Sequence, residues 1–298
     1  MLLLPVLFES AIAQTPAAPA SLPRTAEGHP DLQGVWEFRW RTLLTRPPGA
    51  PVSLPPAGVG PFIERQLEVF RALPGNGNPE SDTDLTTLVR VHGEYRTSLI
   101  VEPADGQIPW LPGRQPPPLT PALMDAIVTD PEQRAPNERC IATESFPMIP
   151  IPTNNYVQIV QPPGAVVMMP EALGHVRRLA PGAVRQASPD VLSRWEGDAL
   201  VVESRNFTPD MRFTQPGTLV GFSPASSVVE TFTPVSADEI FYRFTVTDTT
   251  LYSRPWTVET TWIRSDHSLF EYACHEGNYA LTNILLGGRV REVRKAPR

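Results

Sequence analysis

The chain lacks an excess of positive charge, a long hydrophobic run and all but two cysteines. Its 25 lysines and arginines stand against 32 aspartates and glutamates, which gives a net charge of −7. Nucleic acids and anionic membrane surfaces bind clustered positive charge, so neither is expected as a partner. No later stretch approaches the roughly 18 uninterrupted apolar residues of a membrane-spanning helix. A small molecule or another protein is therefore the expected partner.

The chain also lacks the motifs of the common nucleotide and hydrolase sites. No Gly-x-Ser-x-Gly run, phosphate-cradling glycine loop or dinucleotide fingerprint stands between a predicted strand and a predicted helix. These absences disfavour serine-hydrolase, nucleotide and nicotinamide chemistry. No organic cofactor is expected.

The chain is rich in apolar residues and in proline. Apolar residues make up 41% of its 298 positions, enough to bury a full core. Proline accounts for 36 residues, about 12% against a usual ~5%. Proline residues at that frequency cannot be accommodated in helix interiors or central strands, which excludes long helical bundles.

The N-terminus has the pattern of a secretory signal. Residues 1–8 are all apolar, and Ala11-Ile12-Ala13 supplies a small-x-small cleavage site. We expect a signal peptide at 1–13, a Pro/Ala linker at 14–27 and a single domain at 28–298, in a periplasmic or secreted protein. A buried N-terminal segment is the alternative.

Cys140 and Cys274 form an even count in a chain expected to reach an oxidising compartment. A disulfide between them is the simplest interpretation. It would close a loop of about 135 residues, worth up to about 5 kcal/mol in the chain-entropy model. Two buried free thiols or a metal–thiolate pair are the alternatives, although neither cysteine has the Cys-x-x-Cys spacing that favours a metal.

An insertion of loops and short helices is expected at about 40–135. Residues 46–60 are rich in proline, which predicts an extended loop. Apolar residues from Phe62 to Leu73 recur at helical spacing and predict a short amphipathic helix. Thr120, an N-cap residue followed by Pro121, predicts a second helix.

From residue 154 the hydrophobic period changes to two. Eight short segments rich in β-branched and aromatic residues are predicted strands: 156–161, 165–169, 175–180, 199–205, 228–234, 239–247, 257–264 and 268–274. Short turns between many of them favour antiparallel hairpins. A last helix is predicted after Asn278, a plausible N-cap. We predict a mainly β fold, an up-and-down, lipocalin-like β-barrel around an apolar pocket, with a C-terminal helix; a β-sandwich is the alternative.

Five runs of the chain stand out for their composition: Gly28–Trp36, Asn154–Gln161, Arg194–Glu203, Arg254–Glu259 and Tyr272–Tyr279. Together they resemble a family of predicted secreted proteins from soil and marine bacteria. That family is of uncertain function, so the resemblance implies an exported domain and no particular reaction. Gly34 and Trp36 also resemble the opening signature of the lipocalins.

The chain departs from that family in one of the predicted strands. It has His175-Val176-Arg177-Arg178 where the family has His-Asp-x-Arg, and the loop that follows is shorter. Any role that rests on that aspartate or loop is therefore in question. Alternation along the strand lets either His175 or Arg178 point inward as a catalytic side chain. A basic strand at the surface edge is the alternative.

His275 and Glu276 are the leading catalytic pair. They stand between the last predicted strand and the final helix, where exposed helix N–H groups favour an anion. A histidine beside a carboxylate can act as general acid and base near neutral pH, so we expect both to face the mouth of the pocket. The alternative is that Glu276 and Asn278 cap the helix while His275 packs near the disulfide.

Six further residues are predicted to contact the ligand: Trp36, Tyr156, Trp195, Trp256, Glu259 and Tyr279. Glu259 is either a pocket carboxylate or part of a solvated outer face. His175, His275 and Glu276 or Glu259 could also supply metal ligands. None of these residues has a diagnostic spacing, so no metal is expected.

Two function classes remain. The first is a cofactor-independent acid–base enzyme of lyase, isomerase or hydrolase type, acting on a largely apolar or aromatic small molecule through His275 and Glu276. The second is a non-catalytic periplasmic carrier or sensor that uses the same pocket. Substitution of His275 abolishes turnover in the enzyme, whereas aromatic residues such as Trp195 matter more in the carrier.

Overall fold

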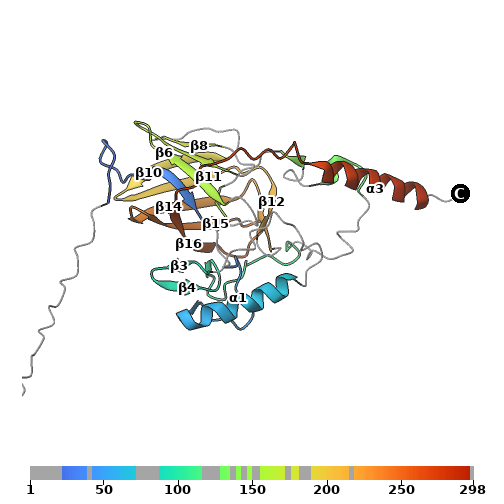
Figure 1. Cartoon of the computed structure of the whole chain (residues 1–298), viewed down its shortest axis with the longest axis horizontal. Coiled ribbons are helices and arrows are strands. Elements are labelled where there is room, and N and C mark those ends of the chain that lie inside the picture. The colour runs from blue at the N-terminus through green and yellow to red at the C-terminus, as the bar shows by residue number, and fades with distance from the viewer. Residues whose placement is uncertain are drawn as a thin grey trace, which may run out of the picture.

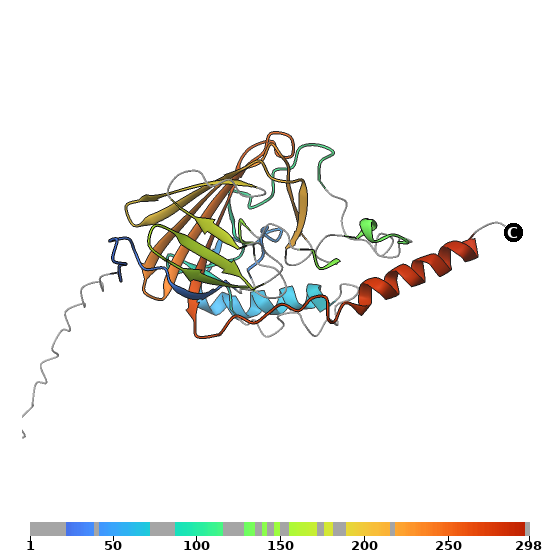
Figure 2. The same ribbon diagram turned by 90° about the horizontal axis from the view of Figure 1, so that it is seen from above.

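The computed structural model describes residues 22–38, 42–71, 87–115, 128–134, 139–141, 146–149, 155–171, 176–180, 189–214 and 218–295. Most of the strands form one antiparallel sheet that curls into a nearly closed barrel (Figures 1 and 2). Helices α1 (Pro56–Arg71) and α3 (Tyr279–Lys295) lie outside it. The predicted mainly β barrel with a C-terminal helix is confirmed.

Around the barrel the strands follow one another in chain order, and the first strand pairs with the last. Around the barrel the order is β10 (Asp190–Glu196), β11 (Ala199–Arg205), β14 (Ser227–Ser236), β15 (Glu239–Thr247), β16 (Trp256–Ser265), β1 (Gly34–Glu37), β6 (Tyr156–Val160), β7 (Val166–Pro170) and β8 (Arg177–Leu179). β1 pairs antiparallel with both β16 and β6. At the seam between the two ends of the sheet, the Ser193 hydroxyl donates a 2.9 Å hydrogen bond to the Ala180 carbonyl.

Smaller elements cover the outside of the barrel. β5 (Ile100–Glu102) pairs with β16, and a small sheet contains β2 (Ser53–Leu54), β3 (Arg90–Val91) and β4 (Glu94–Arg96). β12 (Asp210–Thr214) and β13 (Thr218–Phe222) form a separate hairpin, and Pro131–Gln133 is a short 3-10 helix. Neither α-helix of the described part of the chain is long and apolar enough to cross a membrane.

Alternating side chains fill much of the barrel interior. On β15 the inward residues, all without solvent exposure, are Ile240, Tyr242, Phe244 and Val246. The Tyr242 ring centroid lies 4.7 Å from that of Phe232 on β14 and 4.9 Å from that of Trp262 on β16. Aromatic rings at these separations are packed core. This part of the interior is therefore not the apolar pocket that the sequence led us to expect.

Gly34 opens the first strand at a point where no side chain fits. Its φ is +134°, and a Cβ there would clash with Nη1 of Arg264. The Arg264 guanidinium lies over the Trp36 ring, 4.5 Å from its centroid, and donates to the Gln33 carbonyl at 2.6 Å. The Trp36 indole N–H donates to the Leu32 carbonyl at 2.8 Å. Trp36 is thus held in place on one side of the core.

The prediction of a strand at 268–274 is wrong. β16 ends at Ser265, and residues 266–278 run outside the barrel toward α3 (Figure 2). The edge of β16 on which another strand could pair is already taken by β1, where Val35 faces Ser265. Without a place in the sheet, the segment leaves Phe270 72% exposed.

The insertion is only partly as predicted. α1 contains the predicted helical residues from Phe62 to Arg71, whereas Leu73 lies outside the described residues; the helix begins at Pro56, inside the expected loop. Proline suits the first helical position, because its missing N–H would have no partner there. Phe62, Ile63 and Leu88 form a small buried cluster beneath this helix. The second predicted helix, after Thr120, and the predicted signal peptide at 1–13 lie outside the described residues.

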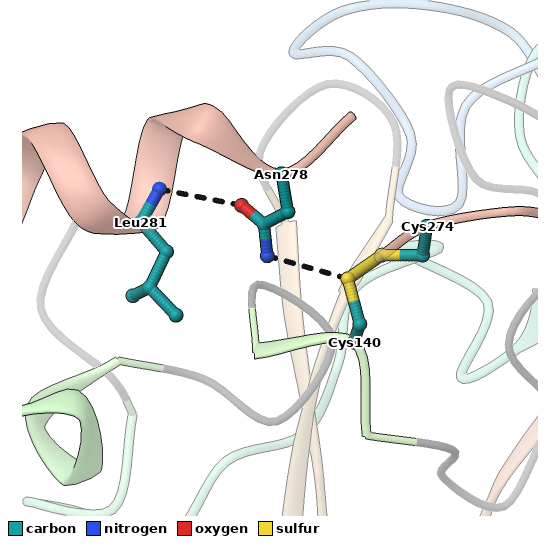
Figure 3. The surroundings of a disulfide bond; sticks show 4 residues. All are labelled: Cys140, Cys274, Asn278 and Leu281. Atoms are coloured by element: carbon teal, nitrogen blue, oxygen red, sulfur yellow. Dashed lines mark hydrogen bonds between the residues drawn. A yellow bond between two sulfur atoms is a disulfide. The ribbon is translucent and has the colours of Figure 1, made fainter. Parts of the chain in front are cut away.

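Cys140 and Cys274 form the predicted disulfide, with 5.6 Å between their Cα atoms (Figure 3). Asn278 lies beside it, and its Nδ2 donates to the Cys140 sulfur at 3.3 Å. The Asn278 Oδ1 accepts the Leu281 backbone N–H at 3.2 Å, which caps the first turn of α3. The disulfide and the cap together fix the N-terminus of α3.

Candidate functional site

A cavity of about 330 Å³ opens at one end of the barrel, beside the seam between β8 and β10. That volume lies within the usual range of small-molecule sites. Its floor consists of buried apolar side chains, among them Val166, Leu179 and Leu200 from three different strands. The half-buried Trp195 from β10 forms part of the wall. The cavity therefore offers a shaped apolar surface at the mouth of the barrel.

An N-terminal segment, residues 23–33, covers this end of the barrel. Arg24 forms a 2.9 Å ion pair with Asp198 in the turn between β10 and β11. The Gly164 N–H, in the turn between β6 and β7, donates to the Glu27 carboxylate at 3.0 Å. Residues 22–27 thus belong to the folded domain, and their assignment to a linker was wrong, because two hairpin turns supply them with partners.

His29 and Trp195 form an aromatic pair at the cavity. Their ring centroids are 4.7 Å apart and the ring planes differ by 6°. Gln161 fixes the covering segment beyond His29, since its Nε2 donates to the Pro30 carbonyl at 3.1 Å and its Oε1 accepts the Leu32 N–H. These bonds hold the imidazole over the indole ring without any contribution from a ligand.

Three of the runs singled out in the sequence meet here. His29 comes from the run Gly28–Trp36, Gln161 from the run 154–161, and Trp195 from the run 194–203. His29 is more than a hundred residues away from both Gln161 and Trp195 in the sequence. Only closure of the barrel brings the three residues together. The structure thus gives these runs a shared location.

The charged side chains at the cavity are already engaged. Arg194 donates to Glu196 and to Glu203, each at 2.6 Å. The hydrogen bond to Glu203, followed by the one to Glu196, raises the pKa of Arg194 above its ordinary value. Glu27 is held by Gly164, as described above. Arg194 and Glu27 thus both have protein partners, which favours a neutral ligand over a charged one.

Of the predicted binding residues, Trp195 lines the cavity and five do not. Trp36 and Trp256 are core residues, 1% and 0% exposed. Tyr156 lies on the outer face of β6, because Val157 and Ile159 take the inward positions. The remaining two, Glu259 and Tyr279, are also outside, for separate reasons.

Glu259 belongs to the outer face of β16. Its carboxylate oxygens lie 3.6 Å from Nε of Arg243 and 3.9 Å from Nη2 of Arg96. The second of the two alternatives raised by the sequence, an outer-face carboxylate, is therefore correct. Tyr279 is the first residue of α3 and is 74% exposed.

His275 and Glu276 do not face the pocket mouth. Both side chains are exposed, in the turn that precedes α3. Figure 2 shows α3 (red) at the opposite end of the molecule from the N-terminal segment (dark blue) that covers the cavity. The prediction failed because it placed this pair at the end of a barrel strand, and the chain has already left the barrel at residue 266. Of the alternative in which Glu276 and Asn278 cap the helix, the structure has the cap by Asn278.

The inward arginine of β8 is Arg177, and not Arg178. Arg177 is 2% exposed, whereas Arg178 is exposed on the outer face. Leu179 shares the inward face with Arg177 and lines the cavity floor. His175, predicted as catalytic, lies outside the described residues.

A buried polar network lies next to the cavity floor. Nη1 of Arg177 is 2.5 Å from Oε2 of Glu230, and Nη2 donates to the Ser204 hydroxyl. The Tyr242 hydroxyl donates to Oε1 of Glu230 at 2.7 Å and accepts the Met148 N–H at 3.0 Å. Burial, followed by the charge of Glu230, raises the pKa of Tyr242 well above its ordinary value.

This network joins strands from across the barrel. It connects β8 to β11, β14 and β15, so it holds the last strand of the sheet in place. The Arg177 guanidinium also lies 4.4 Å from the Phe146 ring centroid. Sequence reasoning missed Glu230, although a carboxylate between the inward-facing Val228 and Phe232 is a visible break in the apolar alternation.

No metal site is visible in the described part of the chain, where no three histidine, cysteine, aspartate or glutamate side chains group together. Comparison with known proteins gives no further guide. No family model matches the chain, and no curated protein or solved structure matches it significantly.

Proposed function

We propose that this protein binds a small, neutral, largely apolar or aromatic molecule in the cavity at the mouth of its barrel. The observation that supports this proposal is the combination of an apolar floor with an aromatic wall. Leu179 and Leu200 contribute to the floor, and Trp195, stacked with His29, forms an aromatic wall beside it. A planar ligand can meet the edge of this aromatic pair and bury its own surface against the aliphatic side chains of the floor.

Polar groups at the rim supply orientation. Thr25, Gln161 and Ser193 line the cavity together with the apolar floor. The Ser193 hydroxyl donates to Ala180 and keeps its acceptor capacity. A two-ring ligand that buries about 200 Å² of apolar surface gains about 5 kcal/mol. Edge-to-face contact with the His29–Trp195 pair adds about 1 kcal/mol, so the dissociation constant is on the order of 10–100 μM.

A carrier or sensor fits this cavity better than an acid–base enzyme. Arg194 and Glu27 are hydrogen-bonded to protein groups, and the pair predicted as acid and base lies outside the barrel. The enzyme alternative now depends on His29, the imidazole that lines the cavity. The disulfide supports an exported location, because such bonds persist in oxidising compartments.

N-phenyl-1-naphthylamine, a neutral aromatic probe that fluoresces in apolar surroundings, tests the binding proposal. We expect saturable binding that Trp195→Ala weakens at least tenfold. Trp110→Ala is the matched control, since Trp110 is also partly buried and packs against Tyr252, 4.9 Å between ring centroids, outside the cavity. Absence of binding, or equal effects of the two substitutions, contradicts the proposal.

The same assay separates the carrier from the enzyme. Compounds that displace the probe are incubated with the protein and recovered by chromatography with mass detection. Unchanged compounds support the carrier. A product whose formation His29→Gln abolishes favours the enzyme, with His29 as the acid–base group.

A further inference from the structure

α3 contacts the rest of the protein along one face. Gly288 lies against the Val128 carbonyl so closely that a Cβ would clash. Leu285, one turn earlier, is buried, and Nε of Arg289 donates to the Thr129 carbonyl at 3.1 Å. Beyond this contact the helix extends away from the barrel in both views (Figures 1 and 2). One side of α3 is therefore packed and the other faces solvent.

The solvent side carries a row of apolar residues, which we call the outer stripe: Tyr279, Leu286, Val290 and Val293, exposed by 74%, 53%, 51% and 75%. Their spacings of seven, four and three residues place them on one face of a helix. At about 100° per residue this face lies roughly 140° around the helix from Leu285 and Gly288. The outer stripe is thus separate from the packed face.

A surface helix of a monomer presents polar residues to water, whereas α3 has apolar residues on two faces. Leu286, Val290 and Val293 form the continuous part of the outer stripe, while the exposed Thr282 and Asn283 lie between them and Tyr279. Exposed apolar residues clustered along one face mark an interaction surface. Four aligned residues along one helix are more than the single exposed apolar side chains found on most surfaces. The outer stripe therefore needs a partner.

Charge identifies the kind of partner. α3 carries Arg289, Arg291, Arg294 and Lys295 against Glu292, a net charge of +3, and the chain's net charge of −7 therefore leaves −10 on the remainder. A second copy of this chain offers an acidic body to a basic helix. Pairing of two α3 helices would bring like charges together, and an anionic membrane would repel the acidic body. Docking of α3 on the body of another copy avoids both.

Interface area determines the symmetry. A helix of 17 residues is about 25 Å long and about 10 Å wide, so one face covers about 250 Å². Counted on both partners, a single docked helix buries about 500 Å², which is below the ~1,000 Å² of a specific interface. Two reciprocal dockings reach that limit, and a twofold axis produces them.

We propose that the outer stripe of α3 docks on the acidic body of a second copy of this chain, reciprocally, in a twofold-symmetric dimer. The interface is small, so the dimer dissociates in the micromolar range. It weakens as ionic strength rises, because part of the attraction is between exposed opposite charges. The proposal is independent of the ligand cavity.

Sedimentation velocity of the full chain with its disulfide intact, from 1 to 100 μM, tests the proposal. We expect a dimer whose dissociation constant rises at least threefold between 50 mM and 500 mM NaCl. Val290→Gln with Val293→Gln raises it at least tenfold, since glutamine keeps the helix and removes the apolar face. Val176→Gln with Val235→Gln removes equally exposed apolar side chains, at 55% and 54%, from the body rather than from α3, and should raise it less than the stripe variant does.

Arg291→Glu with Arg294→Glu provides a second variant that keeps the stripe intact. It should weaken the dimer more at 50 mM than at 500 mM NaCl, with circular dichroism showing that the helix persists. A monomeric wild type at 100 μM and 50 mM NaCl overturns the proposal. So does a dimer that the stripe variant leaves unchanged, or a monomer that sediments with phosphatidylglycerol vesicles through the outer stripe.

Discussion

Arg177→Met is expected to destabilise the barrel by about 3–5 kcal/mol, because it leaves a buried carboxylate without its counter-charge. Glu230 has no solvent exposure, and Arg177 is 2% exposed. Methionine fills a similar volume but restores neither the ion pair nor the hydrogen bond to Ser204. Tyr242 would be the remaining side-chain donor to the Glu230 carboxylate among the described residues.

The magnitude follows from the distance and the burial. At 2.5 Å between Nη1 and Oε2, two unit charges attract by about 7 kcal/mol gross at an effective dielectric constant of about 20. Desolvation of both ions offsets most of that attraction in the intact pair. Removal of Arg177 loses the attraction and keeps the desolvation of Glu230. The double variant Arg177→Met with Glu230→Gln leaves no buried charge without a counter-charge. It should therefore be at least about 1 kcal/mol more stable than Arg177→Met alone.

Thermal unfolding at pH 7 measures these differences. A loss of 3–5 kcal/mol lowers the Tm by about 6–20 °C in a domain of this size. Arg194→Met is the matched control, since Arg194 lies 2.6 Å from Glu203 but is 43% exposed, and it should lower the Tm far less. The reasoning fails if the two single substitutions have equal effects, or if the double variant is the least stable. Arg177→Met should also weaken binding of the naphthylamine probe, because Leu179 on the same strand lines the cavity.

Two further substitutions test local features of the fold. Burial raises the pKa of Asp248, but hydrogen bonds from two serines and Thr250 outweigh it and the pKa lies below its ordinary value. Such a carboxylate stabilises the fold above an unfolded pKa of about 3.9 and ceases to do so as the pH falls through its native pKa. Asp248→Asn should therefore cost about 2 kcal/mol at pH 7, and urea titrations should show the difference from wild type shrinking below about pH 4. Gly34→Ala should cost about 1–3 kcal/mol by displacing the Arg264 guanidinium. In an Arg264→Ala background the same change should cost less, and an undiminished cost would show that the clash is not the cause.

The inward faces of the long strands follow from the sequence alone. In β15 every second residue is apolar, and β14 follows the same alternation except at Glu230; the structure buries both sets, because alternation along a strand is a local property of its backbone. The disulfide could equally be predicted from the sequence, since two cysteines in a chain expected to be exported allow one pairing. Asn278 has the side chain and the position of an N-cap, and it serves as one.

Tertiary structure alone decided where the candidate site lies. Residues 268–274 alternate like a strand, yet β1 occupies the edge on which they would pair, and this displaced His275 from the barrel. His29 and Trp195 meet because the sheet closes and the N-terminal segment crosses its mouth. Periodicity reports which side of its own strand a residue faces, but not which strand is its neighbour. Pairing between distant segments depends on the whole sheet, and the cavity is a product of that pairing.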